Sequence, residues 1–183
     1  VQIHKNLVVV WGQCNAFTGQ GDPYFPFLNI IRMLSGETKT PISGDVISTE
    51  QQQRLINLFP ATIESLIDYG PDILTRFLVI RELLSSTHKQ SGLKPHSSKS
   101  LHAIIKRSMV EKDRHVLQQA AIFEQFTRVL DAIAQNHPLI LLLDDLQWID
   151  SGSVDLLFHL GRRLASSKIL LVGAYRPEEV SLR

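Results

Sequence analysis

The 183-residue sequence has little of what marks an exported, membrane-spanning or nucleic-acid-binding protein. Its single cysteine, Cys14, cannot form an internal disulfide, which suits a reducing compartment such as the cytoplasm. No apolar run approaches the roughly 20 residues needed to cross a bilayer. The formal net charge is only +1, so no excess of positive charge favours nucleic acid or a membrane surface. The composition therefore predicts a soluble globular protein.

A glycine-rich phosphate-binding loop is also missing. The motif Gly-x-x-x-x-Gly-Lys-Ser/Thr, whose backbone N–H groups cradle phosphates, does not occur in the sequence. The closely spaced pair Gly19 and Gly21 precedes Asp22 and Pro23, without the lysine and hydroxyl residue that the motif requires. This pair indicates an ordinary turn.

What the sequence does contain is a buried strand that ends in two carboxylates. The run from Leu139 to Leu143 is wholly apolar, and Asp144 and Asp145 follow it directly. An unbroken apolar run of this kind predicts a parallel strand buried on both faces. Two similar runs, Leu7 to Val10 and Lys168 to Ala174, predict two more such strands. Helices between them imply parallel pairing with right-handed crossovers.

A helical insertion is expected between the first two strands, over about residues 36–113. Ser48 or Thr49 is a candidate cap for its first helix, with Gln51 or Gln52 completing a capping box. Pro60 is expected to end that helix, because proline lacks the backbone N–H that an interior position donates. Residues of about 87–100 are polar and rich in serine, and predict a flexible loop.

Further helices are predicted on both sides of this insertion. One follows Pro23 and Pro26 and ends near Ser35. Within the insertion, a second short helix is expected over Ile63–Tyr69, closed by Gly70 and Pro71. A third is expected from about Asp72 to Ser86. The two longest patterns lie nearer the C-terminus, from about Arg114 to Gln135 and from Ser153 to Ala165, where Asp150 or Ser151 is the candidate cap.

Polar side chains follow two strands at their carboxyl ends, the place where open parallel sheets bind ligands. Asp144 and Asp145 end the second strand and Arg176 follows the third. If these strands are neighbours, the three groups lie along one rim, where they suit a metal-bound polyphosphate. Mg²⁺ takes one or two carboxylates, a second carboxylate can activate water, and arginine can stabilise phosphate charge. A bare Asp-Asp pair would equally suit a turn or a helix cap.

Longer motifs around these residues make the pattern specific. The segments Leu141–Asp150 and Gly173–Val180 resemble the Walker B and sensor 1 segments of AAA-like P-loop ATPase modules, and are most similar to the STAND class of bacterial signal-transduction ATPases. Trp11–Cys14 and Asp22–Phe27 resemble the second strand and following helix of that family. The resemblance implies a three-layer α/β core of the ASCE type with a three-stranded parallel sheet.

By this resemblance the cofactors are ATP and Mg²⁺, and each rim residue has a role. Asp144 is implied as the metal residue, binding Mg²⁺ directly or through water. Asp145 is implied to position or activate the hydrolytic water, and Arg176 to contact the terminal phosphate as the sensor. Asp144, Asp145 and Arg176 are thus the nucleotide-binding residues, with Asp145 and Arg176 the catalytic ones.

Because the phosphate loop is missing, residues 1–183 are expected to be an internal, partial P-loop NTPase domain, inactive alone. Its expected partners are nucleotide and other parts of the same polypeptide: a phosphate-loop segment, a helical lid, and tetratricopeptide repeats or an output domain. No direct contact with nucleic acid or membrane is expected. Two alternatives stay open, a nucleotide-gated switch without significant turnover and a purely structural interaction module.

Overall fold

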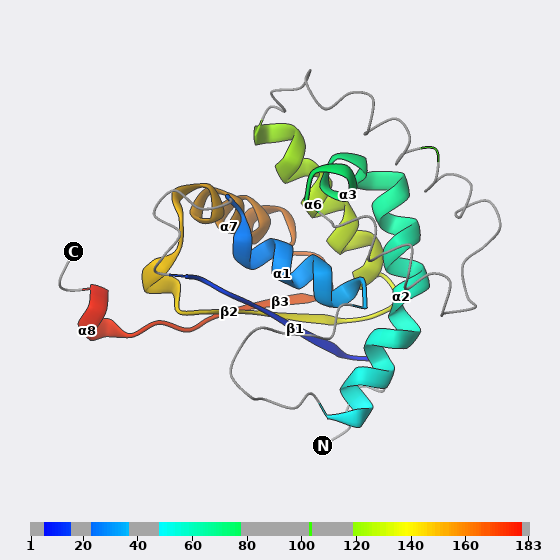
Figure 1. Ribbon diagram of the computed structural model, residues 1–183, viewed down its shortest axis with the longest axis horizontal. Helices are drawn as coiled ribbons and strands as arrows, with labels where there is room; N and C mark the ends of the chain where they lie inside the picture. Colours follow the sequence, from blue (N-terminus) through cyan, green and yellow to red (C-terminus); the bar gives the residue numbers. More distant parts are fainter. Residues whose placement is uncertain (1–5, 16–22, 37–47, 78–102, 104–118, 181–183) are drawn as a thin grey trace.

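The computed structural model describes residues 6–15, 23–36, 48–77, 103 and 119–180. Its three strands are β1 (Val8–Gln13), β2 (Leu139–Asp144) and β3 (Ile169–Gly173). The helices are α1 (Phe25–Leu34), α2 (Thr49–Tyr69), α3 (Pro71–Phe77), α6 (Gln119–Ala134), α7 (Ser151–Arg163) and α8 (Pro177–Val180), with a short 3₁₀ turn, η1 (Leu146–Trp148). Figure 1 shows their arrangement.

The strands form one parallel sheet in the order β1-β2-β3. Leu143 of β2 lies opposite Gly12 of β1 on one side and Gly173 of β3 on the other. The prediction of a three-stranded parallel sheet with helical crossovers is confirmed, as is the position of β2 in the middle. The carboxyl ends of β2 and β3 consequently meet at the same edge of the sheet.

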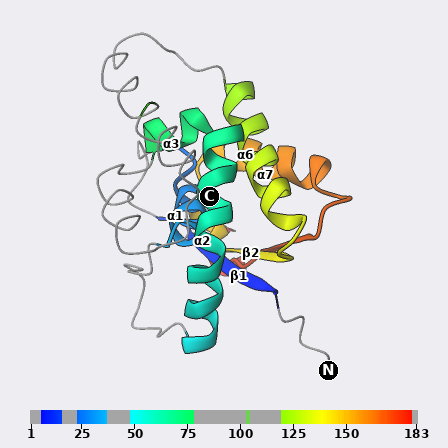
Figure 2. The ribbon, with the colours of Figure 1, turned by 90° about the vertical axis from the view of Figure 1, so that its right-hand side faces the viewer.

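The described helices α1, α6 and α7 lie on one face of the sheet (Figures 1 and 2). Burial in β1 and β2 alternates with this geometry: Val8, Val10, Leu139, Leu141 and Leu143 are at most 1% exposed, and the residues between them are partly exposed. In β3 no residue is buried. The prediction that the three strands are buried on both faces was therefore wrong. An apolar run shows that the side chains on both faces of a strand are hydrophobic. Whether a face is buried depends on whether another element packs against it.

Pro60 lies inside α2, so the prediction that it ends the helix was also wrong. A proline at this position cannot donate to the carbonyl of Ile56, four residues earlier. The helix continues because its apolar side packs against α6, where Phe59 and Ile63 are fully buried. The burial of these side chains outweighs the loss of one backbone hydrogen bond.

The separate short helix predicted over Ile63–Tyr69 was wrong, because these residues continue α2, and α8 was not predicted. The helices α1, α3, α6 and α7 agree with the predicted ones where the structure describes them. Ser48 caps α2, since its Oγ accepts a hydrogen bond from the Gln51 N–H at 3.2 Å. The Gln51 side chain does not complete a capping box but donates to the Val9 carbonyl of β1. The predicted loop of residues 87–100 and the first residues of the predicted 114–135 helix lie outside the described residues. No described helix combines the length and apolarity needed to cross a membrane.

Candidate functional site

The carboxyl end of β2 turns sharply at its two aspartates. Asp144 is the last residue of the strand and lies opposite Gln13 of β1. Asp145 follows with φ 55°, in the left-handed region that few residues other than glycine adopt. Its N–H donates to Asp144 Oδ1 at 2.8 Å, and its carbonyl accepts from the Trp148 N–H at 2.9 Å. These two bonds fix the backbone of the turn in which both carboxylates lie.

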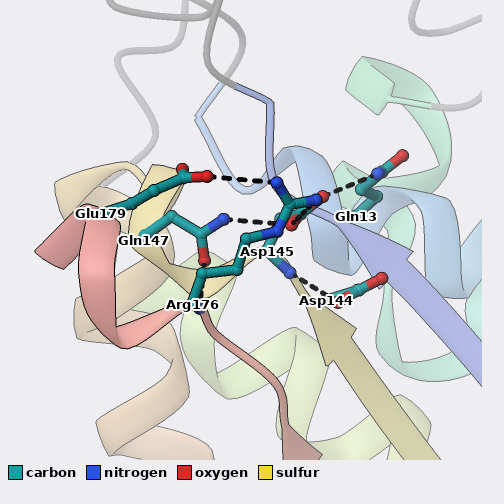
Figure 3. A network of polar contacts seen from close by, with 6 residues as sticks. All are labelled: Gln13, Asp144, Asp145, Gln147, Arg176 and Glu179. Carbon is teal, nitrogen blue, oxygen red and sulfur yellow. Dashed lines mark hydrogen bonds and ion pairs between the residues drawn. The ribbon is translucent and has the colours of Figure 1, made fainter.

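The Asp145 carboxylate is the centre of a polar network (Figure 3). Its Oδ2 accepts a hydrogen bond from Gln13 Nε2 at 2.9 Å, and its Oδ1 accepts one from Gln147 Nε2 at 3.0 Å. Arg176 Nη2 lies 3.6 Å from the same Oδ1. The side chain is only 16% exposed. Groups from β1, η1 and the segment after β3 thus fix both oxygens of one shielded carboxylate.

Arg176 is held at its backbone, and its guanidinium is exposed. Its N–H donates to Gln147 Oε1 at 3.1 Å. Its guanidinium pairs with Glu179 Oε1 of α8 at 3.1 Å and with Asp145, yet the side chain is 67% exposed. An exposed ion pair of this kind contributes little to stability. The guanidinium can therefore exchange these carboxylates for another anion at small cost.

Asp144 lies to one side of the cluster around Asp145 (Figure 3). Among the described residues, its carboxylate has one hydrogen bond, from the Asp145 N–H. Burial of the neighbouring Cys14, and after it the carboxylates of Asp150, Asp145 and Asp144, raise the pKa of its thiol to about 12. Three carboxylates therefore lie close to this end of β2, where a cation could use them.

The donor set fits Mg²⁺ held jointly with a phosphate. Within the described residues there is no group of three or more His, Cys, Asp or Glu arranged to hold a metal alone. Mg²⁺ does not need such a cage, because it usually keeps several waters and binds one or two carboxylates together with substrate phosphates. Asp144 has the free coordinating capacity for this, whereas Asp145 has both oxygens engaged.

Asp150 has the capping role that its position predicts. Its Oδ1 accepts from the Ser153 N–H at 2.8 Å at the start of α7, and its Oδ2 accepts from the Ser153 hydroxyl. The structure therefore brings together Asp144, Asp145 and Arg176, the three residues expected at the rim, while Asp150 is committed to the helix terminus.

Three rim residues were not predicted from the sequence: Gln13, Gln147 and Glu179. Gln13 could have been found from strand register, because it ends β1 as Asp144 ends β2. Glu179 is three residues after Arg176, a spacing that brings side chains together in a helical turn. Gln147 gives no signal beyond its place next to the aspartates, since its burial (7% exposed) is set by the fold.

A separate concavity of about 450 Å³ lies on the surface of α6 and α7. It is lined by Phe123, Asp155, Phe158, His159, Arg162 and Arg163, and none of these is a rim residue. Arg163 is engaged there by Glu124, whose pKa is lowered by hydrogen bonds from Arg163 and then Arg128. This concavity lacks the adjacent carboxylates found at the rim, so the rim is the better candidate for a metal-nucleotide site.

Comparison with protein families agrees with this geometry. Residues 2–172 match the family described as the AAA ATPase domain. The match covers nearly the whole chain, and the chain therefore belongs to this family. No curated protein and no solved structure matches the chain significantly.

Proposed function

We propose that this member of the AAA ATPase domain family binds ATP with Mg²⁺ at the rim of Asp144, Asp145 and Arg176, and hydrolyses it to drive a regulatory switch. The observation that carries the proposal is the shielded Asp145 carboxylate, adjacent in sequence to Asp144 and 3.6 Å from Arg176, which follows the neighbouring strand β3. A cation site, a base and an anion-binding group are thereby combined at the edge where parallel sheets bind ligands.

Each residue has a chemical task in this proposal. Asp144 holds Mg²⁺, directly or through water, as the residue of a Walker B segment does; the bound cation neutralises phosphate charge. Asp145 orients the attacking water and accepts its proton. Arg176, as the sensor 1 residue, leaves its exposed ion pairs to contact the terminal phosphate, where its charge stabilises the transition state.

The remaining parts of the site are assigned to other segments. No Gly-x-x-x-x-Gly-Lys-Ser/Thr motif occurs in residues 1–183, so we place the phosphate loop and a helical lid elsewhere in a longer polypeptide. Residues 1–183 are then a partial domain. In that polypeptide, of the STAND signalling type, nucleotide state would control an output domain in the cytoplasm, where ATP and Mg²⁺ are abundant.

The test is Asp145→Asn in the nucleotide-binding polypeptide. Asparagine keeps the shape of the side chain but cannot accept a proton, so we expect kcat for ATP to fall by at least about 100-fold with nucleotide affinity nearly unchanged. Phosphate release measures the first quantity and calorimetry the second. The matched control is Asp155→Asn, an exposed carboxylate of α7 outside the rim, which should leave both unchanged.

A second function, nucleotide-gated switching without turnover, is favoured by one observation. Both oxygens of Asp145 already accept hydrogen bonds from glutamine side chains, a state that suits a fixed structural carboxylate as well as a base. The same variant separates the two functions. If signalling by the polypeptide persists when Asp145→Asn has removed turnover, nucleotide binding alone operates the switch.

A further inference from the structure

We propose that Gln147 is a positioning residue that keeps Asp145 oriented when Arg176 moves to the nucleotide. This inference rests on the proposed function of the rim. It assigns a task to a side chain that contacts neither nucleotide nor metal in that proposal, and it follows from the contacts drawn in Figure 3.

Both ends of the Gln147 carboxamide form hydrogen bonds, and their partners follow two different strands. Nε2 donates to the Asp145 carboxylate at 3.0 Å, at the end of β2, and Oε1 accepts from the Arg176 N–H at 3.1 Å, beyond β3. The residue is 7% exposed, so water cannot easily replace either bond. A side chain must both donate and accept to fill this position, and glutamine has the required polarity at each end.

The left-handed backbone of Asp145 makes such support necessary. A non-glycine residue at φ 55° persists only where the surrounding structure holds it. Gln13 fixes Oδ2 of the carboxylate from β1, and Gln147 fixes Oδ1 from η1. Each oxygen thus has its own amide donor, and the plane of the carboxylate is set by the pair.

With this arrangement, the orientation of the Asp145 carboxylate does not depend on the position of the Arg176 guanidinium. Asp145 Oδ1 has two neighbours, the guanidinium Nη2 of Arg176 at 3.6 Å and the amide Nε2 of Gln147 at 3.0 Å. When a terminal phosphate draws the guanidinium away, Oδ1 keeps the shorter bond to Gln147. The same carboxamide still holds the Arg176 backbone, so the arginine swings from a fixed base. Asp145 therefore stays aimed at the attacking water through the movement.

The experiment replaces Gln147 with methionine, which keeps the length of the side chain but neither donates nor accepts strongly. In the nucleotide-hydrolysing polypeptide we expect Gln147→Met to lower kcat by about 10- to 100-fold, with KM for ATP and the nucleotide Kd within about 3-fold. The matched control is Gln125→Met on α6. Its carboxamide also bonds at both ends, to the N–H and carboxylate of Asp72, but lies outside the rim.

A second variant gives a readout that a structural role would not change. In Gln147→Glu, the introduced carboxyl can donate to Asp145 only while it is protonated, and repels it once ionised. The kcat of this variant relative to wild type should therefore fall as pH rises from about 5 to 8. Gln147→Met should give a ratio that is independent of pH.

The outcomes are distinguishable. Absence of ATP turnover in the wild-type polypeptide overturns the proposed function and this inference with it. Turnover in the wild type that Gln147→Met leaves intact overturns the positioning role alone. A loss of kcat matched by an equal loss in Gln125→Met, or one that follows unfolding in thermal melts, also overturns it. A loss confined to the Gln147 variants, with the expected pH dependence, supports it.

Discussion

The two outer strands of the sheet, β1 and β3, differ in how their outer edges are hydrogen-bonded. The edge of β1 is closed by α2: Gln51 Nε2 donates to the Val9 carbonyl, and Arg54 Nη1 donates to the Leu7 carbonyl at 2.6 Å. Along the outer edge of β3, no described residue donates or accepts a hydrogen bond, and Leu170 is 56% exposed. Two backbone carbonyls on the outer edge of β1 thus accept hydrogen bonds from α2, whereas the outer edge of β3 has no hydrogen-bond partner among the described residues.

This difference indicates where another strand could pair with the sheet. Unpaired N–H and C=O groups along an apolar strand form a template for pairing, and proteins usually cover such edges. Among the described residues, side chains of α2 bond to the outer edge of β1, and none bonds to the outer edge of β3, the strand that leads to Arg176. In the proposed assembly, a strand from another segment of the polypeptide would fit beside β3, close to the rim. Three tests, with four substitutions and their controls, probe the comparison, from the largest expected effect to the smallest.

The two glycines that flank Leu143 should respond unequally to alanine. A Cβ at Gly12 of β1 would lie 1.9 Å from the Pro26 carbonyl oxygen, which is backbone. A Cβ at Gly173 of β3 would meet only Leu146 Cδ1, at 2.5 Å, and that side chain can rotate. We expect Gly12→Ala to lower the free energy of unfolding by about 3 kcal/mol or more, and Gly173→Ala by about 1 kcal/mol.

Urea denaturation measures both glycine variants. The control is Gly161→Ala in α7, where an added Cβ meets no atom within 4 Å, and which should raise stability by about 0.5–1 kcal/mol. Equal losses for the two strand glycines would contradict the inference that Gly12 faces rigid backbone of α1, whereas Gly173 faces a side chain that can rotate.

The helical cover of the β1 edge should contribute measurably. Arg54→Met removes the donor to the Leu7 carbonyl and leaves that backbone group unsatisfied. We expect a loss of about 1–2 kcal/mol in the free energy of unfolding. As control, Arg128→Met removes an exposed ion pair with Glu124 and should cost less than about 0.5 kcal/mol. If the two arginines cost the same, the β1 edge is not closed in the way described.

The open β3 strand should show its effect in association more than in stability. Leu170→Lys places a charge on the exposed face of β3, and we expect the free energy of unfolding to change by less than about 0.5 kcal/mol. Self-association, followed by light scattering against concentration, should decrease because lysine opposes strand pairing. Ile56→Lys adds the same charge on the exposed side of α2 and should leave association unchanged. A similar decrease in both variants would point to net charge and not to the β3 strand.

The sequence allowed much of this architecture to be predicted because local patterns were strong. The apolar runs gave the strands, their alternation with helices gave parallel pairing, and Ser48 marked the start of α2. Pro60 was misjudged because a propensity describes an isolated helix, whereas packing against α6 stabilises this one. The partly exposed face of β2 was misjudged because the strand's residues are apolar on both sides.

By itself the sequence determined that a buried strand ends in Asp144 and Asp145 and that the chain has no phosphate-loop motif, since both are statements about consecutive residues. It also carried the motifs of the AAA ATPase domain family. Only the tertiary structure decided what surrounds Asp145. Gln13 lies 132 positions from it along the chain, and Gln147 and Arg176 are 29 positions apart. The register of the three strands brings them together, and register depends on burial and backbone pairing across the whole sheet.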